Sequence, residues 1–144
     1  MEEALLSALQ QRRDEIRTRW DALMRLERAD TALANPDTLA FLFDQTLDEV
    51  LAKLPGKPVA PIRRRPTCQC GCNPMRVYFP ALEQALLETL ILVQTEMPEL
   101  ASRARLDSVT ELCTTLRRIA RREIAVFDDI CQHNTAGRST EYSI

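Results

Sequence analysis

The sequence predicts an all-α fold, an antiparallel four-helix bundle with a long proline- and cysteine-rich loop between its second and third helices. In four stretches of the chain, apolar residues recur at steps of three and four, as they do on one face of a helix. No stretch shows the alternation of apolar and polar residues that is typical of a half-buried strand. With 144 residues, the chain is long enough for one domain with its own core.

The first predicted helix covers about residues 2–30. Its apolar stripe consists of Leu5, Leu9, Ile16, Trp20 and Leu23. Because Trp20 is in register with this stripe, we expect it in the core or at the edge of an interface. A second helix is predicted to begin at Pro36, with Asn35 as its cap, and to end at Pro55. Its stripe consists of Leu39, Phe43, Leu47, Val50 and Leu54.

The third helix is predicted to begin at Pro80 and to be the most buried of the four, because apolar residues cover most of its surface. These residues are Leu82, Ala85, Leu86, Leu87, Leu90, Ile91 and Val93. Pro98 ends this helix, and the inward stripe of the fourth helix consists of Leu106, Val109, Cys113, Leu116, Ala120, Phe127 and Cys131. The prediction is one domain over residues 1–134, with the loop at 55–80 and a flexible tail at 135–144.

Three cysteines at two-residue spacing, Cys68, Cys70 and Cys72, lie in the loop between the second and third helices. Prolines exclude regular helix from most of this loop, and loops of this length in compact domains are usually functional or tied down. Thiols this close together can bind a soft metal or exchange between thiol and disulfide. We therefore expect a site for zinc, with copper(I) or an iron–sulfur centre as alternatives.

Two further candidate ligands, Cys131 and His133, follow the fourth helix. In an up-down-up-down bundle, the end of that helix lies beside the loop between helices two and three. Cys113 precedes Cys131 by five helical turns, about 27 Å, so it cannot share the metal, and we expect it inside the bundle as a small buried residue. The loop cysteines could instead be reduced and without partners, and His133 could be an exposed residue near a helix end.

Other charged and aromatic residues have simpler interpretations. Four arginines of the fourth helix and three in the loop could contact phosphate, and those of the loop could favour thiolate formation, but a solvated surface explains them better. The helix arginines are Arg117, Arg118, Arg121 and Arg122, and those of the loop are Arg63, Arg64 and Arg65; Arg76 joins the loop arginines as a candidate for favouring thiolate formation. Asp44 and Asp48, one helical turn apart, are interpreted as surface acids, because the ExxH motif of a di-iron site is absent.

Composition excludes several classes of protein. A net charge of −2 gives no reason to expect nucleic-acid binding, and no apolar run is long enough to cross a membrane. The acidic start of the chain lacks the features of a secretory signal, so a cytoplasmic location is expected. P-loop, GxGxxG, GxSxG and HExxH motifs are all missing, and the prediction is that the protein is not an enzyme.

Two segments resemble a known family. Arg13-Asp14-Glu15-Ile16-Arg17-Thr18-Arg19-Trp20 and the leucine-rich stretch from Pro36 to Leu54 resemble the helical N-terminal input domain of stressosome co-antagonist proteins of the RsbR and RsbRD type. The resemblance covers about the first half of the chain. It implies a dimerising sensory or protein-interaction module rather than a catalyst. This chain departs from the family in carrying the cysteine cluster, and a signalling role would need a separate partner.

The leading interpretation is a small cytoplasmic helical module for binding or regulation, whose loop thiols bind a soft metal or sense redox state. Its expected partner is a protein, and a second copy of the chain is one candidate. One alternative is a thiol oxidoreductase or sulfur-handling enzyme that uses a loop cysteine as nucleophile. Another is a purely structural bundle for protein interaction.

Overall fold

The computed structural model describes residues 1–26, 36–54 and 73–129, and this part of the chain is all-α, as predicted. It contains the helices α1 (Glu3–Gln11), α2 (Arg13–Leu26), α3 (Pro36–Lys53), α4 (Met75–Thr95) and α5 (Ser102–Asp129). Strands are absent from these three ranges. No helix within them combines the length and the apolar character that crossing a membrane requires.

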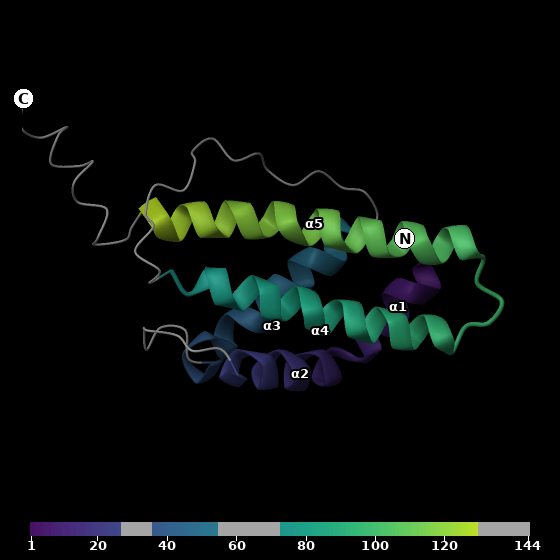
Figure 1. Ribbon diagram of the computed structural model, residues 1–144, viewed down its shortest axis with the longest axis horizontal. Helices are drawn as coiled ribbons and strands as arrows, with labels where there is room; N and C mark the ends of the chain where they lie inside the picture. The colour runs from purple at the N-terminus through teal and green to yellow at the C-terminus, as the bar shows by residue number, and fades with distance from the viewer. Residues whose placement is uncertain (27–35, 55–72, 130–144) are drawn as a thin grey trace, which may run out of the picture.

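The helix α4 is the centre of the fold, because it packs against α1, α2 and α5. Figure 1 shows α4 and α5 side by side and running in opposite directions, joined by the short connection at residues 96–101. The helix α3 contacts α2 and α5. More buried residues belong to α4 than to any other helix that the structure describes, which confirms the prediction made for the third helix.

The connection between α4 and α5 is closed by the side chain of Arg105. Its guanidinium donates hydrogen bonds to the backbone carbonyl oxygens of Gln94 at 2.7 Å, Met97 at 2.6 Å and Leu100 at 3.1 Å. The last carbonyl groups of a helix have no partner within the helix, so a cation at this position both completes their hydrogen bonds and interacts favourably with the helix dipole. One side chain therefore ends α4 and orients the start of α5.

An aromatic cluster joins α2, α3 and α4. The ring centroid of Trp20 lies 5.1 Å from that of Phe43 and 5.3 Å from that of Tyr78, and Tyr78 also contacts the ring of Phe79. All four side chains are buried, and Trp20 is only 1% exposed. The predicted core position of Trp20 is therefore confirmed.

The first predicted helix is interrupted at Arg12, which lies between α1 and α2 with φ −103° and ψ 22°. In an unbroken helix, Arg12 or Arg13 would fall on the apolar stripe between Leu9 and Ile16, where a guanidinium without a partner is costly to bury. At the break, Arg12 pairs with Glu96 and Arg13 turns to the acids of α3. The prediction of one helix is therefore wrong here, and its expected end near residue 30 lies outside the described residues.

The third predicted helix begins earlier than expected, at Met75, and Pro80 lies inside α4. Proline has no amide donor, so the helix loses the hydrogen bond that residue 80 would give to the carbonyl of Arg76. The added turn buries the side chains of Met75, Tyr78 and Phe79, and their burial offsets this loss. The predicted loop over residues 55–80 is thus wrong at its end, because residues 75–80 are helical.

The predicted inward stripe of α5 is rotated relative to the core. Leu106 is 62% exposed and Cys113 is half-buried, whereas Ser108 and Asp128 are buried. Ser108 is accommodated because its hydroxyl accepts a hydrogen bond from the Gln94 side chain at 2.7 Å. Among the other described members of the predicted stripe, Leu116 is buried, whereas Val109, Ala120 and Phe127 are half-buried.

Candidate functional site at the junction of α4 and α5

The five predicted metal ligands, Cys68, Cys70, Cys72, Cys131 and His133, lie outside the residues that the structure describes. Among the residues it does describe, no group of three or more histidine, cysteine, aspartate or glutamate side chains could hold a metal ion. The described residues nearest to these ligands along the chain are at the start of α4 and the end of α5. The geometry of the junction between α4 and α5 is therefore the structural information that is relevant to the predicted thiol site.

A polar cluster with two buried members, Asn73 and Asp128, and one exposed member, Arg76, joins α4 to α5 and is here called the Asn73 anchor. The Asn73 amide nitrogen donates to Asp128 Oδ1 at 2.8 Å and to the backbone carbonyl of Ile124 at 3.0 Å. Its amide oxygen accepts from the Met75 backbone N–H at 3.0 Å. Arg76 donates to Asp128 Oδ2 at 2.9 Å. Both ends of the Asn73 amide are thus engaged, one on each helix.

The burial of Asn73 and Asp128 restricts which groups can satisfy their hydrogen bonds. Asp128 is 1% exposed and Asn73 is 6% exposed, so each depends on its partners for the hydrogen bonds that water would otherwise supply. Asn73 directly follows Cys72, and Asp128 precedes Cys131 by three residues. Asn73 was not predicted as part of a site, and the signal in the sequence that could have indicated it is an aspartate near the end of a long amphipathic helix.

A groove of about 280 Å³ runs between α4 and α5 from the Asn73 anchor. Phe79 and Leu116, both buried, contribute apolar surface to it, and Arg76 lines its end. The ion pair between Arg117 and Glu83, with Nε and Oε1 2.8 Å apart, links the two helices across it. The groove therefore combines apolar lining with charged groups that are already paired.

Cys113, the only cysteine in the described ranges, lies beside this ion pair as a half-buried free thiol. Burial raises its pKa above the ordinary value for a thiol, and the charge of Glu83 raises it further while Arg117 opposes the shift. A raised pKa leaves the protonated thiol dominant at neutral pH, and the protonated form is a poor nucleophile. Cys113 is therefore a packing residue, although it is less buried than predicted.

The arginines of α5 fall into two groups. Arg122 forms two hydrogen bonds to the Glu49 carboxylate, at 2.7 and 2.6 Å, which join α5 to α3 and lower the pKa of Glu49. Arg117 pairs with Glu83. Arg118 and Arg121 are exposed, and within the described ranges no acid pairs with either. The basic patch predicted for this helix is thus half neutralised.

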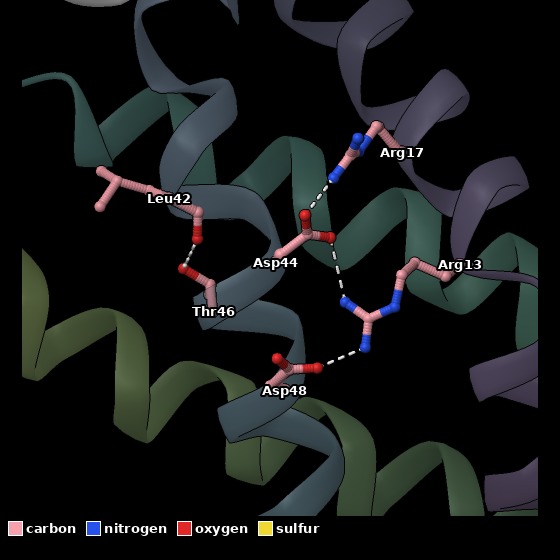
Figure 2. A network of polar contacts seen from close by, with 6 residues as sticks. All are labelled: Arg13, Arg17, Leu42, Asp44, Thr46 and Asp48. Carbon is pink, nitrogen blue, oxygen red and sulfur yellow. Dashed lines mark hydrogen bonds and ion pairs between the residues drawn. The ribbon is translucent and has the colours of Figure 1, made fainter.

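Asp44 and Asp48 face arginines rather than each other (Figure 2). Arg13 pairs with both carboxylates and Arg17 pairs with Asp44 at 2.5 Å, forming what is here called the Arg–Asp ladder between α2 and α3. The pKa of Asp44 is lowered, chiefly by the hydrogen bond from Arg17. These contacts agree with the interpretation of both residues as surface acids.

Comparison of the chain with protein-family models, with curated protein sequences and with solved structures found no match. The functional argument therefore depends on the chemistry of the chain itself. Three closely spaced thiols precede a buried asparagine that ties their segment to two helices, and this combination is the most distinctive chemical feature of the protein.

Proposed function

We propose that the protein is a small helical module for binding or regulation, in which Cys68, Cys70 and Cys72 form a thiol site that binds a soft metal or responds to redox state. The observation that carries this proposal is the burial of Asn73, the residue after Cys72, in hydrogen bonds to α5. A tethered end lowers the conformational entropy that the thiols lose when they converge on one metal ion.

The fold completes the proposed site in one way. The whole chain forms an antiparallel four-helix bundle in which α1 and α2 together act as one arm, and residues 55–72 are the long connection. Cys131 or His133 supplies the fourth ligand, since Asp128, which bonds Asn73, is only three residues before Cys131. Consecutive α-carbons are about 3.8 Å apart, so the few residues between Cys68 and Asn73 and between Asp128 and His133 are long enough for their side chains to reach one metal ion. Thiolate-rich sets suit zinc, with copper(I) or an iron–sulfur centre as alternatives.

The module acts through a protein partner and has no catalytic activity of its own. Its resemblance to input domains of stressosome co-antagonists supports a sensory role, in which the state of the thiols alters how the helices bind that partner. The Asn73 anchor supplies the connection that such a role needs, because one of its residues adjoins the thiol segment and the others lie on α4 and α5.

Elemental analysis of protein purified without chelators tests the metal-binding form. We expect about one equivalent of zinc, or another soft metal, in the parent protein, and its loss in Cys70→Ser. Cys113→Ser is the matched control, because this thiol lies in the α4–α5 pair beside Glu83 and should not affect metal content.

The redox form predicts that mild peroxide treatment oxidises loop thiols and leaves Cys113 reduced, as measured by mass spectrometry after alkylation. Absence of metal, together with equal alkylation of all cysteines before and after peroxide, would contradict both forms of the proposal. A loop thiol that alkylates fast at acidic pH would instead favour the oxidoreductase alternative.

A further inference from the structure

The groove between α4 and α5 has the size and lining of a site for a small molecule. Its volume of about 280 Å³ lies just below the range of about 300 to 1,000 Å³ for drug-sized ligands. Its apolar lining comes from Phe79 and Pro80 on α4 and from Leu116, Ala120 and Ile124 on α5. Apolar side chains that converge with a few polar groups at the margin are typical of ligand sites, and this one suits a molecule smaller than a drug.

Charged side chains limit the length of this groove. Arg76 lines one end, and the ion pair between Glu83 and Arg117 spans the other. Glu83 follows Arg76 by seven residues, which at a rise of about 1.5 Å per residue is about 10 Å along α4. A rigid body of this length fits better than a flexible chain, because an open groove buries too little surface to offset the rotamer freedom that a chain loses.

The two arginines in the lining keep hydrogen-bond donors free although each is paired. Within the described ranges, Arg76 bonds Asp128 through Nη2, and Arg117 bonds Glu83 through Nε. A guanidinium has five N–H donors, so most of those on either side chain stay available to a ligand. The side chain of Arg76 is 43% exposed and that of Arg117 is 64% exposed, so an anion can reach both from solvent.

A third arginine, Arg121, gives this region one positive charge in excess. It follows Arg117 by four residues and precedes Ile124 by three, so it shares their side of α5. It is exposed, and no acid in the described part of the chain pairs with it. The three arginines border the groove together with two carboxylates, those of Glu83 and Asp128. A ligand with a single negative charge therefore balances the region, whereas a dianion would not.

We infer that the groove between α4 and α5 binds a small, rigid, apolar monocarboxylate, whose ring system lies on Leu116 and Ala120 and whose carboxylate lies between Arg76 and Arg121. Arginine suits this role because its planar fork matches the geometry of a carboxylate. The site uses none of the loop thiols, so the inference goes beyond the proposed function and does not depend on it.

Titration of the full chain with 2-naphthoate, followed by amide NMR spectra, tests this site. We expect saturable shifts of the signals from Phe79 to Glu83 and from Leu116 to Ile124, with a Kd of about 1 mM or tighter for a ligand of this size. The signals of α1, which does not line the groove, should not move. Octanoate, which carries the same charge on a flexible chain, should bind more weakly, and 2-naphthylmethylammonium, which carries the opposite charge, should not bind measurably.

Two pairs of variants locate the charge and the apolar floor. Arg121→Gln should raise the Kd about three- to tenfold, because it removes the unpaired charge. Its matched control is Arg118→Gln, an exposed arginine about 100° around α5 from Arg117, which should change the Kd less than about twofold. Ala120→Leu fills the groove and should abolish the shifts, whereas Ala104→Leu enlarges a half-buried alanine outside the groove and should bind like the parent.

Shifts that do not saturate or that spread over all helices would overturn the inference. So would octanoate binding as tightly as 2-naphthoate, equal effects of the two arginine variants, or retained binding by Ala120→Leu. If circular dichroism shows that Ala120→Leu is unfolded, the arginine pair and the two other ligands still decide. Cys70→Ser should bind 2-naphthoate like the parent, so loss of this ligand and loss of metal are separate outcomes.

Discussion

The Arg–Asp ladder and the Asn73 anchor both join helices through arginine and aspartate, but the side chain of Asp44 is 53% exposed whereas that of Asp128 is 1% exposed. In the ladder, water can replace either partner, and the ion pairs are weakened by salt. In the anchor, Asp128 is almost fully shielded from water, so it depends on protein groups, Asn73 and Arg76 among them, for its hydrogen bonds. The same pairing of residue types therefore carries different energetic weight in the two regions.

The difference also separates their structural roles. Exposed pairs between α2 and α3 favour one relative placement of these helices without making it obligatory. The anchor determines where the chain leaves the cysteine-bearing segment, because a shift of Asn73 would separate its buried amide from Asp128 and from the carbonyl of Ile124. Burial, rather than the number of ion pairs, thus identifies the junction of α4 and α5 as the region to test first.

The largest effect is expected for Asp128→Ala. The change removes the acceptor of a buried amide and the partner of Arg76, so the free energy of unfolding should fall by about 2 to 4 kcal/mol in urea titrations. Asp107→Ala is the control on the same helix, because Asp107 is half-exposed and its ion pair in the described part of the chain is with Arg103, and its loss should cost about 0.5 kcal/mol or less. Equal losses for the two variants would refute the distinction drawn from burial.

A smaller loss of stability is expected when the pH is lowered. The pKa of Asp44 is lowered chiefly by the hydrogen bond from Arg17, and that of Glu49 chiefly by the one from Arg122. A carboxyl group with a lowered pKa in the folded state stabilises the fold above its unfolded pKa of about 4, and this stabilisation is lost as pH falls through the lower folded value.

Urea midpoints should therefore be constant above about pH 5 and fall progressively below pH 4. Glu49→Gln, which cannot titrate, should be less stable than the parent at neutral pH and should show a flatter decline in acid. A parent protein as stable at pH 3 as at pH 7 would show that these ion pairs contribute nothing.

The smallest effect is expected for Asp44→Ala, which removes one member of the ladder. The expected loss is at most about 1 kcal/mol, and it should disappear in about 1 M salt, because exposed charges are screened over a few ångströms there. Chemical unfolding in urea at low and high salt measures it. The loss caused by Asp128→Ala should persist at both salt concentrations, and a loss that vanished in salt would place the anchor in the same class as the ladder.

Much of the fold was predictable from apolar spacing. Trp20, Phe43 and Leu82 are buried as their helical register indicates, and α3 begins at Pro36 as proposed. The break at Arg12 was not predicted, because periodicity extends across a polar gap without showing that the helix changes direction there. The start of α4 was also missed, since Pro80 resembles a helix start and only the burial of Tyr78 shows that the helix already exists.

The candidate site was less predictable. Cysteine spacing identified the thiols, but spacing carries no information about Asn73, whose role depends on a residue far along the chain, Asp128. Similarly, the apolar residues of α5 cover a wide arc, and the sequence alone could not decide which part of it the core would take. Ser108 is buried because Gln94 reaches it, whereas Leu106, expected inside, is exposed.

Trp20 is the only tryptophan of the chain, and it contacts Phe43 on α3 and Tyr78 on α4 while belonging to α2 itself. A buried indole emits at shorter wavelength than a hydrated one, so the intrinsic fluorescence of the native protein reports the contact of three helices at once. Separation of any one of them should move the emission toward the red. The protein therefore carries its own optical probe, and no dye or label is needed to follow its unfolding.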